Sequence, residues 1–294
     1  MAEPRYKVKA IGAPFEINHS SCSNITPSTF EWTTNTAEWE VYIDRGMLFH
    51  SRPDLSIPKN KRYGWLCESK FIVPDVYSFL IHNHKVLFEN YYNKIFTCDQ
   101  DLIDLNPNFQ FCPSGSNYPW IPKNQWKVYD KSKLCSMFCS PKLITQGHVH
   151  RHQVARLALD CGFSVFGGAH GTPRTVTDIR NPWNSKLHGV KDYMFSIVIE
   201  NGIYDSYWTE KITDCFASGT IPVYLGTKKI FDFFDSNGII WLEPGKEQDI
   251  INSLSQELYM SKIQAVQNNF NIVQSIKLAD EYLFDYIKNE TTNT

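Results

Sequence analysis

The sequence has 294 residues and lacks the features that mark several special classes of protein. No apolar run approaches the roughly eighteen residues of a membrane helix, and residues 1–14 carry charges and prolines where a secretory signal has its apolar segment. The eight cysteines show no paired Cys-x-x-Cys spacing, which favours reduced thiols packed as small apolar residues over a zinc site. We therefore expect a soluble cytoplasmic protein with no membrane span.

The near-neutral net charge excludes a large charged surface for binding a partner. A net charge of -2 offers no basic surface to nucleic acid or to an acidic membrane, so recognition of any phosphate must be local. No internal repeat or low-complexity segment is evident. The chain is 42% hydrophobic, which is typical of globular proteins, and it is long enough for two domains.

Short apolar runs alternate with helical patterns along the chain. This alternation predicts parallel sheets, and the two sets of runs predict an α/β fold with two Rossmann-like domains. Residues 106–127 are dense in proline, glycine and asparagine, so we expect an irregular connection there and domains at 1–130 and 131–294. The expected strands are 8–11, 40–43, 64–67, 94–98, 133–139, 164–166, 194–199, 221–225 and 239–242, and the expected helices are 150–161, 210–218, 248–259 and one near the C-terminus.

The most informative segment is 193–226, which has the pattern of strand, polar loop, short helix and second strand. Its run 194–199 is apolar and bounded by polar residues, as in a strand buried on both faces of a parallel sheet. Glu200 and Asn201 follow at the carboxyl end of that strand. Because open α/β sheets bind ligands at this edge, we expect a ligand site here.

The helix that follows begins with charged and hydrogen-bonding residues. Thr209 can cap it, and its free N–H groups together with Lys211 create a positive environment that favours an anion. Taken alone, Glu210 and Lys211 also fit ordinary surface charges in a first helical turn. Their association with Asn201 and Tyr207 between two buried strands favours a binding site.

The segment resembles the sugar-nucleotide motif of the α-1,3-fucosyltransferases. That motif is a hydrophobic strand, Phe-Glu-Asn, a short loop, Tyr-x-Thr/Ser-Glu-Lys, a helix, and a strand with Ile/Val-Pro. Here it stands as residues 199–201, 207–211 and 220–226, with Ile199 in place of the usual phenylalanine. The resemblance is strong over the second half of the chain and faint over the first.

This resemblance implies a GT-B fold, in which two Rossmann-like domains face a central cleft and the C-terminal domain holds GDP-fucose. It further implies inverting, metal-independent transfer, with Lys211 and an upstream arginine at the diphosphate. The best match to that arginine is Arg151, with Arg156 as the alternative. A guanidinium can grip a diphosphate through two parallel hydrogen bonds, so the residue type fits this role.

The resemblance also implies roles for four other residues. The catalytic base of the family is a glutamate after an early strand, and Glu68 in RYGWLCESKF is the best match, with Cys67 at the usual glycine. A solvent-facing residue at a strand end is the alternative interpretation of Glu68. By resemblance Glu210 binds the ribose hydroxyls, while Asn201 and Tyr207 contact the diphosphate or the fucose.

Two patterns could indicate a metal, and we interpret neither as a metal site. Asp99-Gln100-Asp101 has Asp-x-Asp spacing but lies far in sequence from the phosphate-binding segment, so we expect a solvated turn. His148, His150 and His152 would share one face of a strand, but a helix that begins near His150, with Arg151 in its first turn, separates them. The glycine-rich stretch 167–171 predicts a plain turn.

The sequence thus predicts transfer of L-fucose from GDP-fucose to a hydroxyl of a glycan acceptor, with no cofactor and no nucleic-acid partner. The expected absence of an anchor fits a soluble bacterial or viral enzyme, and it also fits a chain from which an anchor has been removed. A transferase of another GDP-sugar is one alternative. A non-catalytic glycan-binding protein on the same fold is the other, since 8 tryptophans and 15 tyrosines supply stacking surfaces.

Overall fold

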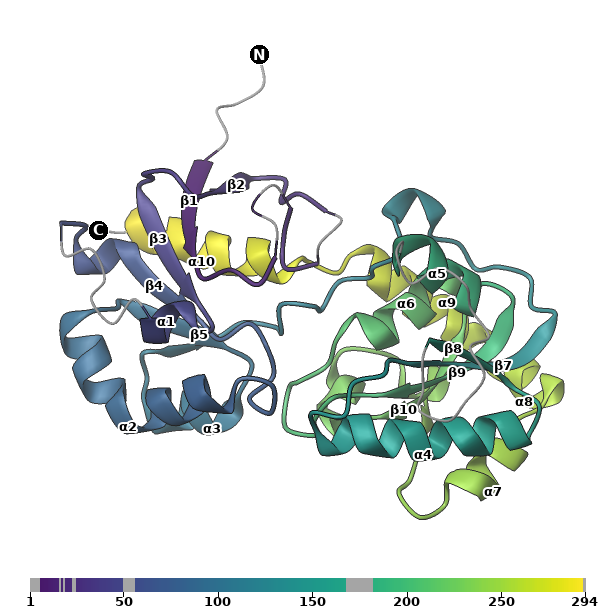
Figure 1. Ribbon diagram of the computed structural model, residues 1–294. Coiled ribbons are helices and arrows are strands. Elements are labelled where there is room, and N and C mark those ends of the chain that lie inside the picture. Colours follow the sequence, from purple (N-terminus) through teal and green to yellow (C-terminus); the bar gives the residue numbers. More distant parts are fainter. Residues whose placement is uncertain are drawn as a thin grey trace. The chain divides into compact units, whose positions relative to one another are not determined.

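The computed structural model of the chain describes residues 6–15, 17, 19–22, 25–49, 56–167 and 182–292. These residues form two compact α/β units, each built on one parallel sheet (Figure 1). Unit 1 comprises Met1–Asn117, Asp205–Tyr207 and Lys277–Thr294, and unit 2 comprises Tyr118–Tyr204 and Trp208–Ile276. Two parallel sheets with helices are the fold class that the alternating sequence pattern predicts.

The sheet of unit 1 has six strands in the order β2-β1-β3-β4-β5-β6, and all of its pairings are parallel. Successive residues of its central strand β3 face opposite sides: Val41 packs in one core with Leu283 of α10, and Tyr42 packs in another with Leu80 of α2. Helices thus cover both faces of this sheet. Its strands are β1 (Tyr6–Ile11), β2 (Phe30–Thr33), β3 (Trp39–Ile43), β4 (Arg62–Trp65), β5 (Lys94–Thr97) and β6 (Phe109–Phe111), and its helices are α1 (Gly46–Phe49), α2 (Pro74–Asn90), α3 (Gln100–Leu105) and α10 (Ala279–Thr292).

The sheet of unit 2 has five parallel strands in the order β11-β10-β9-β7-β8. Its central strand β9 is buried at every position, with Ile197 in the core that includes Val154 of α4 and Val198 in the core that includes Ile212 of α6. A strand buried on both faces was expected from its continuous apolar run. The strands are β7 (Lys133–Cys139), β8 (Ser164–Gly167), β9 (Tyr193–Ile199), β10 (Ile221–Leu225) and β11 (Ile240–Trp241), and the helices are α4 (Gln146–Asp160), α5 (Pro182–Val190), α6 (Glu210–Ser218), α7 (Glu247–Asn252), α8 (Gln256–Ser261) and α9 (Ile263–Gln274).

The division into units differs from the expected boundary at residue 130. The first division falls at residue 117, inside the irregular stretch 106–127, and the C-terminal helix α10 returns to unit 1. Asp280 at its start explains the return, because its carboxylate accepts hydrogen bonds from the Ser21 backbone and from Trp32 Nε1. Such a contact joins residues that are distant in sequence, and no local pattern predicts it.

Several elements differ from the sequence predictions. The helix expected at 248–259 is two helices, because Ser255 caps a new helix by accepting from the N–H of Leu258 at 3.1 Å. Strands β2 and β6 and the long helix α2 were not predicted. The expected strand 64–67 lies two residues earlier, at Arg62–Trp65.

None of the eight cysteines, all of which lie in described residues, forms a disulfide, and seven of them are buried, as expected from the lack of paired spacing. No helix in the described part of the chain is long and apolar enough to cross a membrane. The cytoplasmic location remains a prediction.

Candidate functional site

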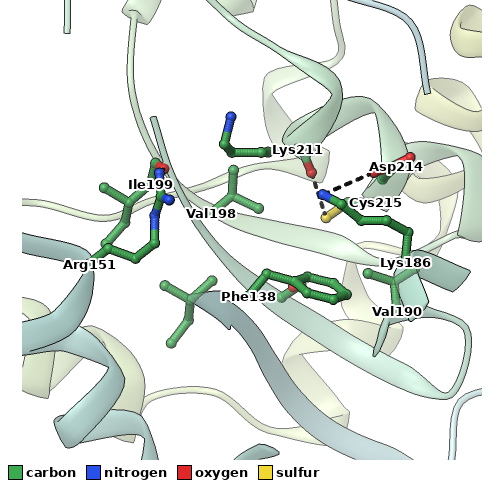
Figure 2. Close-up of a pocket in the computed structure, with 11 residues that line it drawn as sticks. Phe138, Arg151, Lys186, Val190, Val198, Ile199, Lys211, Asp214 and Cys215 are labelled. Atoms are coloured by element: carbon green, nitrogen blue, oxygen red, sulfur yellow. Dashed lines mark hydrogen bonds and ion pairs between the residues drawn. The ribbon is translucent and has the colours of Figure 1, made fainter. Parts of the chain in front are cut away.

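The carboxyl end of β9 holds the residues that the sequence singled out in unit 2. Ile199 is the last residue of the strand, and Glu200 and Asn201 follow it directly. Glu200 is fully buried, and its N–H donates to Leu225 O of the neighbouring strand at 2.9 Å. Figure 2 shows Arg151 and Lys211 on the two sides of this strand end.

Arg151 is fixed directly onto this strand end. Its Nη2 donates to Ile199 O at 2.5 Å and to Asn201 Oδ1 at 3.0 Å, and the residue is 5% exposed. The close approach of α4 depends on Gly147, because a Cβ at that position would lie 2.1 Å from Glu200 O. Two charged hydrogen bonds from this one nitrogen hold the guanidinium in place. Arg156, which the sequence offered as the alternative to Arg151, is exposed on α4.

Helix α4 begins one turn earlier than the sequence predicted, so Arg151 lies in its second turn. The reason is a cap at Thr145, whose hydroxyl accepts from His148 N at 3.2 Å while His148 Nδ1 accepts from Thr145 N at 3.3 Å. This arrangement is a capping box with histidine in place of the usual glutamate. Burial, with the Arg151 charge, lowers the pKa of His148 to about 4, so the cap is neutral at physiological pH.

Lys211 lies in the first turn of α6 and is held by Glu200. Its Nζ donates to Glu200 Oε2 at 3.2 Å and to Thr209 Oγ1 at 2.7 Å. Glu200 Oε1 also accepts from the N–H of Thr209 at 3.0 Å, so one buried carboxylate fixes both the cap and the lysine. Residues 199–201 therefore hold two cations. Ile199 and Asn201 accept from Arg151, and Glu200 accepts from Lys211.

A third cation, Lys186 of α5, was missed in the sequence. Its Nζ lies 3.4 Å from Asp214 Oδ2 and 3.6 Å from Glu210 Oε1, and above the rings of Trp120 and Phe138. Burial alone would lower the pKa of Lys186, but Asp214 and Glu210 outweigh it and raise that pKa above its ordinary value. Lysine is common on helix surfaces, so its position in the sequence gave no signal.

The two acidic partners of Lys186 respond differently to burial. Burial would raise the pKa of Glu210, but Lys211 and Lys186 hold it below its ordinary value. For Asp214 burial outweighs Lys186, and the pKa rises to about 6. Asp214 Oδ1 also accepts the N–H groups of Trp120 and Ile121, at 2.7 and 3.1 Å.

Cations and carboxylates therefore interleave at this end of the sheet. A small pocket lies among them, and Figure 2 shows Arg151, Lys186 and Lys211 around it. Its apolar lining comes from both sheet and helices: Phe138, Val190, Ile197, Val198, Ile199 and Cys215. Fixed cations beside a helix N-terminus form an arrangement suited to a phosphate group.

Tyr207 and Glu68 belong to unit 1. Tyr207 is 1% exposed and lies in Asp205–Tyr207, the short segment of the motif that clusters with that unit. Glu68 is half-buried and lies three residues after the end of β4. Its Oε1 accepts from the N–H of Ser69 at 2.7 Å, and its own N–H donates to Asp44 Oδ1 at 3.1 Å.

The Asp-x-Asp sequence is accounted for by the structure of α3. Asp99 caps this helix by accepting from the N–H of Leu102 at 3.2 Å, and Lys70 lies 2.7 Å from Asp99 and 3.0 Å from Asp101. Asp99 is 1% exposed, so the expectation of a solvated turn was wrong for this residue. The capping role explains the burial, because the carboxylate replaces water at the helix start.

The three alternating histidines lie on α4 and have separate partners. His148 belongs to the cap, His152 Nε2 lies 3.2 Å from Lys142 O, and His150 Nε2 lies 3.1 Å from Glu247 Oε1. Among the residues that the structure describes, no group of histidine, cysteine and carboxylate side chains could hold a metal ion. Residues 168–171 of the glycine-rich stretch lie outside the described residues.

The segment that contains this site matches a known protein family. Residues 128–243 match the family described as glycosyltransferase family 10 (fucosyltransferase) C-term. The α-(1,4)-fucosyltransferase of Arabidopsis thaliana is 36% identical over 59 residues, which are 20% of this chain and 15% of the plant protein. The matched segment therefore spans a small part of that relative.

Solved structures share the fold over most of the chain. A crystal structure of an α1,3-fucosyltransferase with GDP superposes with a TM-score of 0.53 and 13% identity, and covers 95% of this chain and 93% of that one. A structure of S. aureus TarM in complex with UDP gives 0.52 and 12%, and covers 85% of this chain and 55% of that one. At such identities the likeness establishes the fold, which is GT-B. Residues 128–243 thus correspond to the C-terminal domain of the fucosyltransferases of glycosyltransferase family 10.

Proposed function

We propose that this chain is a fucosyltransferase that moves L-fucose from GDP-fucose to a hydroxyl of a glycan acceptor, with inversion and without a metal ion. The observation that carries the proposal is the pair of cations at the carboxyl end of β9. Arg151 donates to Ile199 O and Asn201 Oδ1, and Lys211 donates to Glu200. The family domain at residues 128–243 supports the reaction class.

In the proposed reaction, the bond between the fucose anomeric carbon and the diphosphate breaks as the acceptor oxygen forms a new bond on the opposite face. GDP leaves with the bonding electrons, so negative charge develops on its phosphates. Arg151, Lys211 and the N–H groups that begin α6 stabilise that charge. Preorganised charge of this kind contributes about 10²- to 10³-fold for each donor in other enzymes.

Metal independence follows from the same cations in this proposal. Many glycosyltransferases bind the diphosphate through a divalent ion held by Asp-x-Asp, whereas the Asp99-Gln100-Asp101 carboxylates engage Lys70 and the start of α3. Fixed cationic side chains supply the positive charge instead. Such side chains keep their positions when the donor binds, so little reorganisation is required at the moment of transfer.

Glu68 is the proposed base, which accepts the proton of the acceptor hydroxyl during transfer. A base of this kind contributes about 10²- to 10⁴-fold. In unit 2 we assign Asn201 to the donor and Glu210 to the ribose hydroxyls, since two carboxylate oxygens match a vicinal diol. Tyr207 offers a hydroxyl and an apolar ring face to the sugar. Lys186 and Lys211 already hold Glu210, so donor binding must share that carboxylate with them.

The test is the substitution Glu68→Gln, which keeps the shape of the side chain and removes its basicity. We expect the transfer rate to fall by at least about 100-fold while GDP affinity, measured by calorimetry, stays within about twofold of wild type. Asp75→Asn is the control, because Asp75 is an exposed carboxylate of unit 1 that pairs with Arg45 at 2.9 Å. Unchanged transfer by Glu68→Gln would remove Glu68 as the base.

A donor screen separates the two alternatives. Turnover of another GDP-sugar in preference to GDP-fucose would identify a transferase with a different donor. Binding of GDP without any transfer product, in the presence of a glycan library, would identify a non-catalytic glycan-binding protein.

A further inference from the structure

A buried carboxyl of unit 1, Asp44, lies beside the proposed base. It follows the last residue of β3, and β3 pairs with β4 in parallel, so the two strand ends are neighbours. Asp44 is 4% exposed, and its backbone N–H donates to Trp65 O at the end of β4 at 2.9 Å. The residue therefore joins the ends of two adjacent strands.

The side chain of Asp44 holds the loop that carries Glu68. Its Oδ1 accepts from the N–H of Cys67 at 2.8 Å and from the N–H of Glu68 at 3.1 Å. The Glu68 carboxylate in turn accepts from the N–H of Ser69 at 2.7 Å. Hydrogen bonds thus fix both the backbone and the side chain of Glu68, as a base with a defined direction requires.

The backbone at Asp44 is also unusual. Its φ angle is 46°, in the left-handed region that non-glycine residues other than aspartate and asparagine rarely adopt. Its Oδ2 is buried, and no hydrogen-bond partner for this oxygen is found within the described ranges. A residue with a left-handed backbone and only one hydrogen-bonded carboxyl oxygen lowers the stability of the fold. Such residues are often found at functional sites.

We propose that Asp44 is a positioning residue for the base Glu68, acting through the two N–H groups that its Oδ1 accepts. This inference rests on the proposed function, because it takes Glu68 as the proton acceptor. Asp44 itself touches neither substrate in this role. It sets the direction of the loop after β4, and with it the place of the Glu68 carboxylate.

The substitution Asp44→Ala removes the acceptor. A displacement of about 1 Å at a catalytic group costs up to about 100-fold in rate, so we expect kcat to fall by about 10- to 100-fold. The KM for the donor and the affinity for GDP should stay within about twofold, because the proposed donor-binding cations lie in unit 2. Asp44→Asn retains an acceptor oxygen and suits the left-handed backbone, so we expect it to keep kcat within about threefold of wild type.

A double-mutant cycle tests whether Asp44 acts through Glu68 or in another way. In the Glu68→Gln background, Asp44→Ala should reduce the residual rate by less than about twofold, because the base that it positions is already absent. Equal fold-losses in both backgrounds would overturn the proposal. Asp75→Asn again serves as the control for loss of a carboxylate in unit 1, and a thermal melt verifies that each variant is folded.

The remaining outcomes are also decisive. If Glu68→Gln abolishes transfer while Asp44→Ala leaves it unchanged, the inference about Asp44 fails and the proposed function stands. If Glu68→Gln itself leaves transfer unchanged, the base assignment fails, and the inference fails with it. Should Asp44→Ala not fold, Asp44→Asn carries the test alone, and a loss of more than about tenfold in its kcat would overturn the proposal.

Discussion

The two units bury carboxylates at the ends of central strands but stabilise them in different ways. In unit 2, Lys211 Nζ lies 3.2 Å from Glu200 and Lys186 Nζ lies 3.4 Å from Asp214. In unit 1, Asp44 accepts two backbone N–H groups, and no ion pair to it is found in the part of the chain that the structure describes. One strand end is lined by paired charges, and the other by a carboxyl with neutral donors.

This difference corresponds to two different chemical demands. In the proposed reaction a departing diphosphate needs fixed positive charge, and the carboxylates Glu200, Glu210 and Asp214 hold Lys186 and Lys211 in place. In unit 1, the loop that carries the proposed base is held through backbone N–H groups that Asp44 accepts. The proposed division of labour between the units thus corresponds to two different ways of holding the residues at a strand end.

The largest effect should come from removal of a buried cation in unit 2. Lys186→Ala leaves Asp214 and Glu210 buried beside each other with one ammonium fewer, and loss of one partner of a buried pair costs about 3 to 5 kcal/mol. We expect the free energy of unfolding, measured in urea, to fall by about that amount. Adding Asp214→Asn should restore part of the loss, because it removes one of the uncompensated charges.

Lys229→Ala is the matched control for this comparison. Lys229 is exposed and lies 3.7 Å from Asp232, so its removal should change the free energy of unfolding by less than about 0.5 kcal/mol. A small loss for Lys186→Ala, equal to that of Lys229→Ala, would show that unit 2 does not depend on its buried charges.

A smaller effect concerns pH and distinguishes Asp44 from the paired carboxylates. Burial, reinforced by the Glu68 charge, raises the pKa of Asp44 from 3.8 to about 7, although the Cys67 and Glu68 N–H groups and Arg45 oppose it. The folded chain thus holds this proton more tightly than the unfolded chain. The stability that it contributes is fully present below about pH 4 and is lost as pH rises through 7, by up to about 1.4 kcal/mol per pH unit.

Asp44→Asn cannot ionise, so its free energy of unfolding should fall less steeply than that of wild type between about pH 4 and about pH 7. Urea unfolding at several pH values measures the two slopes, with Asp75→Asn as the control that should follow wild type. Parallel slopes for wild type and Asp44→Asn would mean that Asp44 does not titrate in this range.

The clustering of the candidate residues in unit 2 was largely predictable because they are contiguous in sequence, whereas their roles in binding remain predictions. Strand β9, the Glu200-Asn201 pair and the helix with Lys211 follow one another within one βαβ segment, and local patterns encode such segments well. The sequence also placed Arg151 near this segment, although the Thr145 cap begins its helix one turn earlier than predicted. A capping box with histidine at its third position does not match the usual sequence signature.

The missed features depend on contacts between distant residues. Lys186 meets Asp214 from a separate helix, and Asp280 joins α10 to Ser21 across 259 positions. Asp44 reaches Glu68 only because β3 and β4 are neighbours in the sheet. Strand order and the packing of the last helix are set by tertiary contacts, which a single sequence does not reveal.

The most direct test of the central claim is a calorimetric titration of GDP in the presence of EDTA. We predict that the wild-type protein binds GDP with the same affinity with and without the chelator, and that Lys211→Ala binds it at least about tenfold more weakly. Lys229→Ala, which removes an exposed lysine of the same unit, should bind as wild type. Loss of GDP binding in EDTA that Mg²⁺ restores, or an unchanged affinity in Lys211→Ala, would contradict the account.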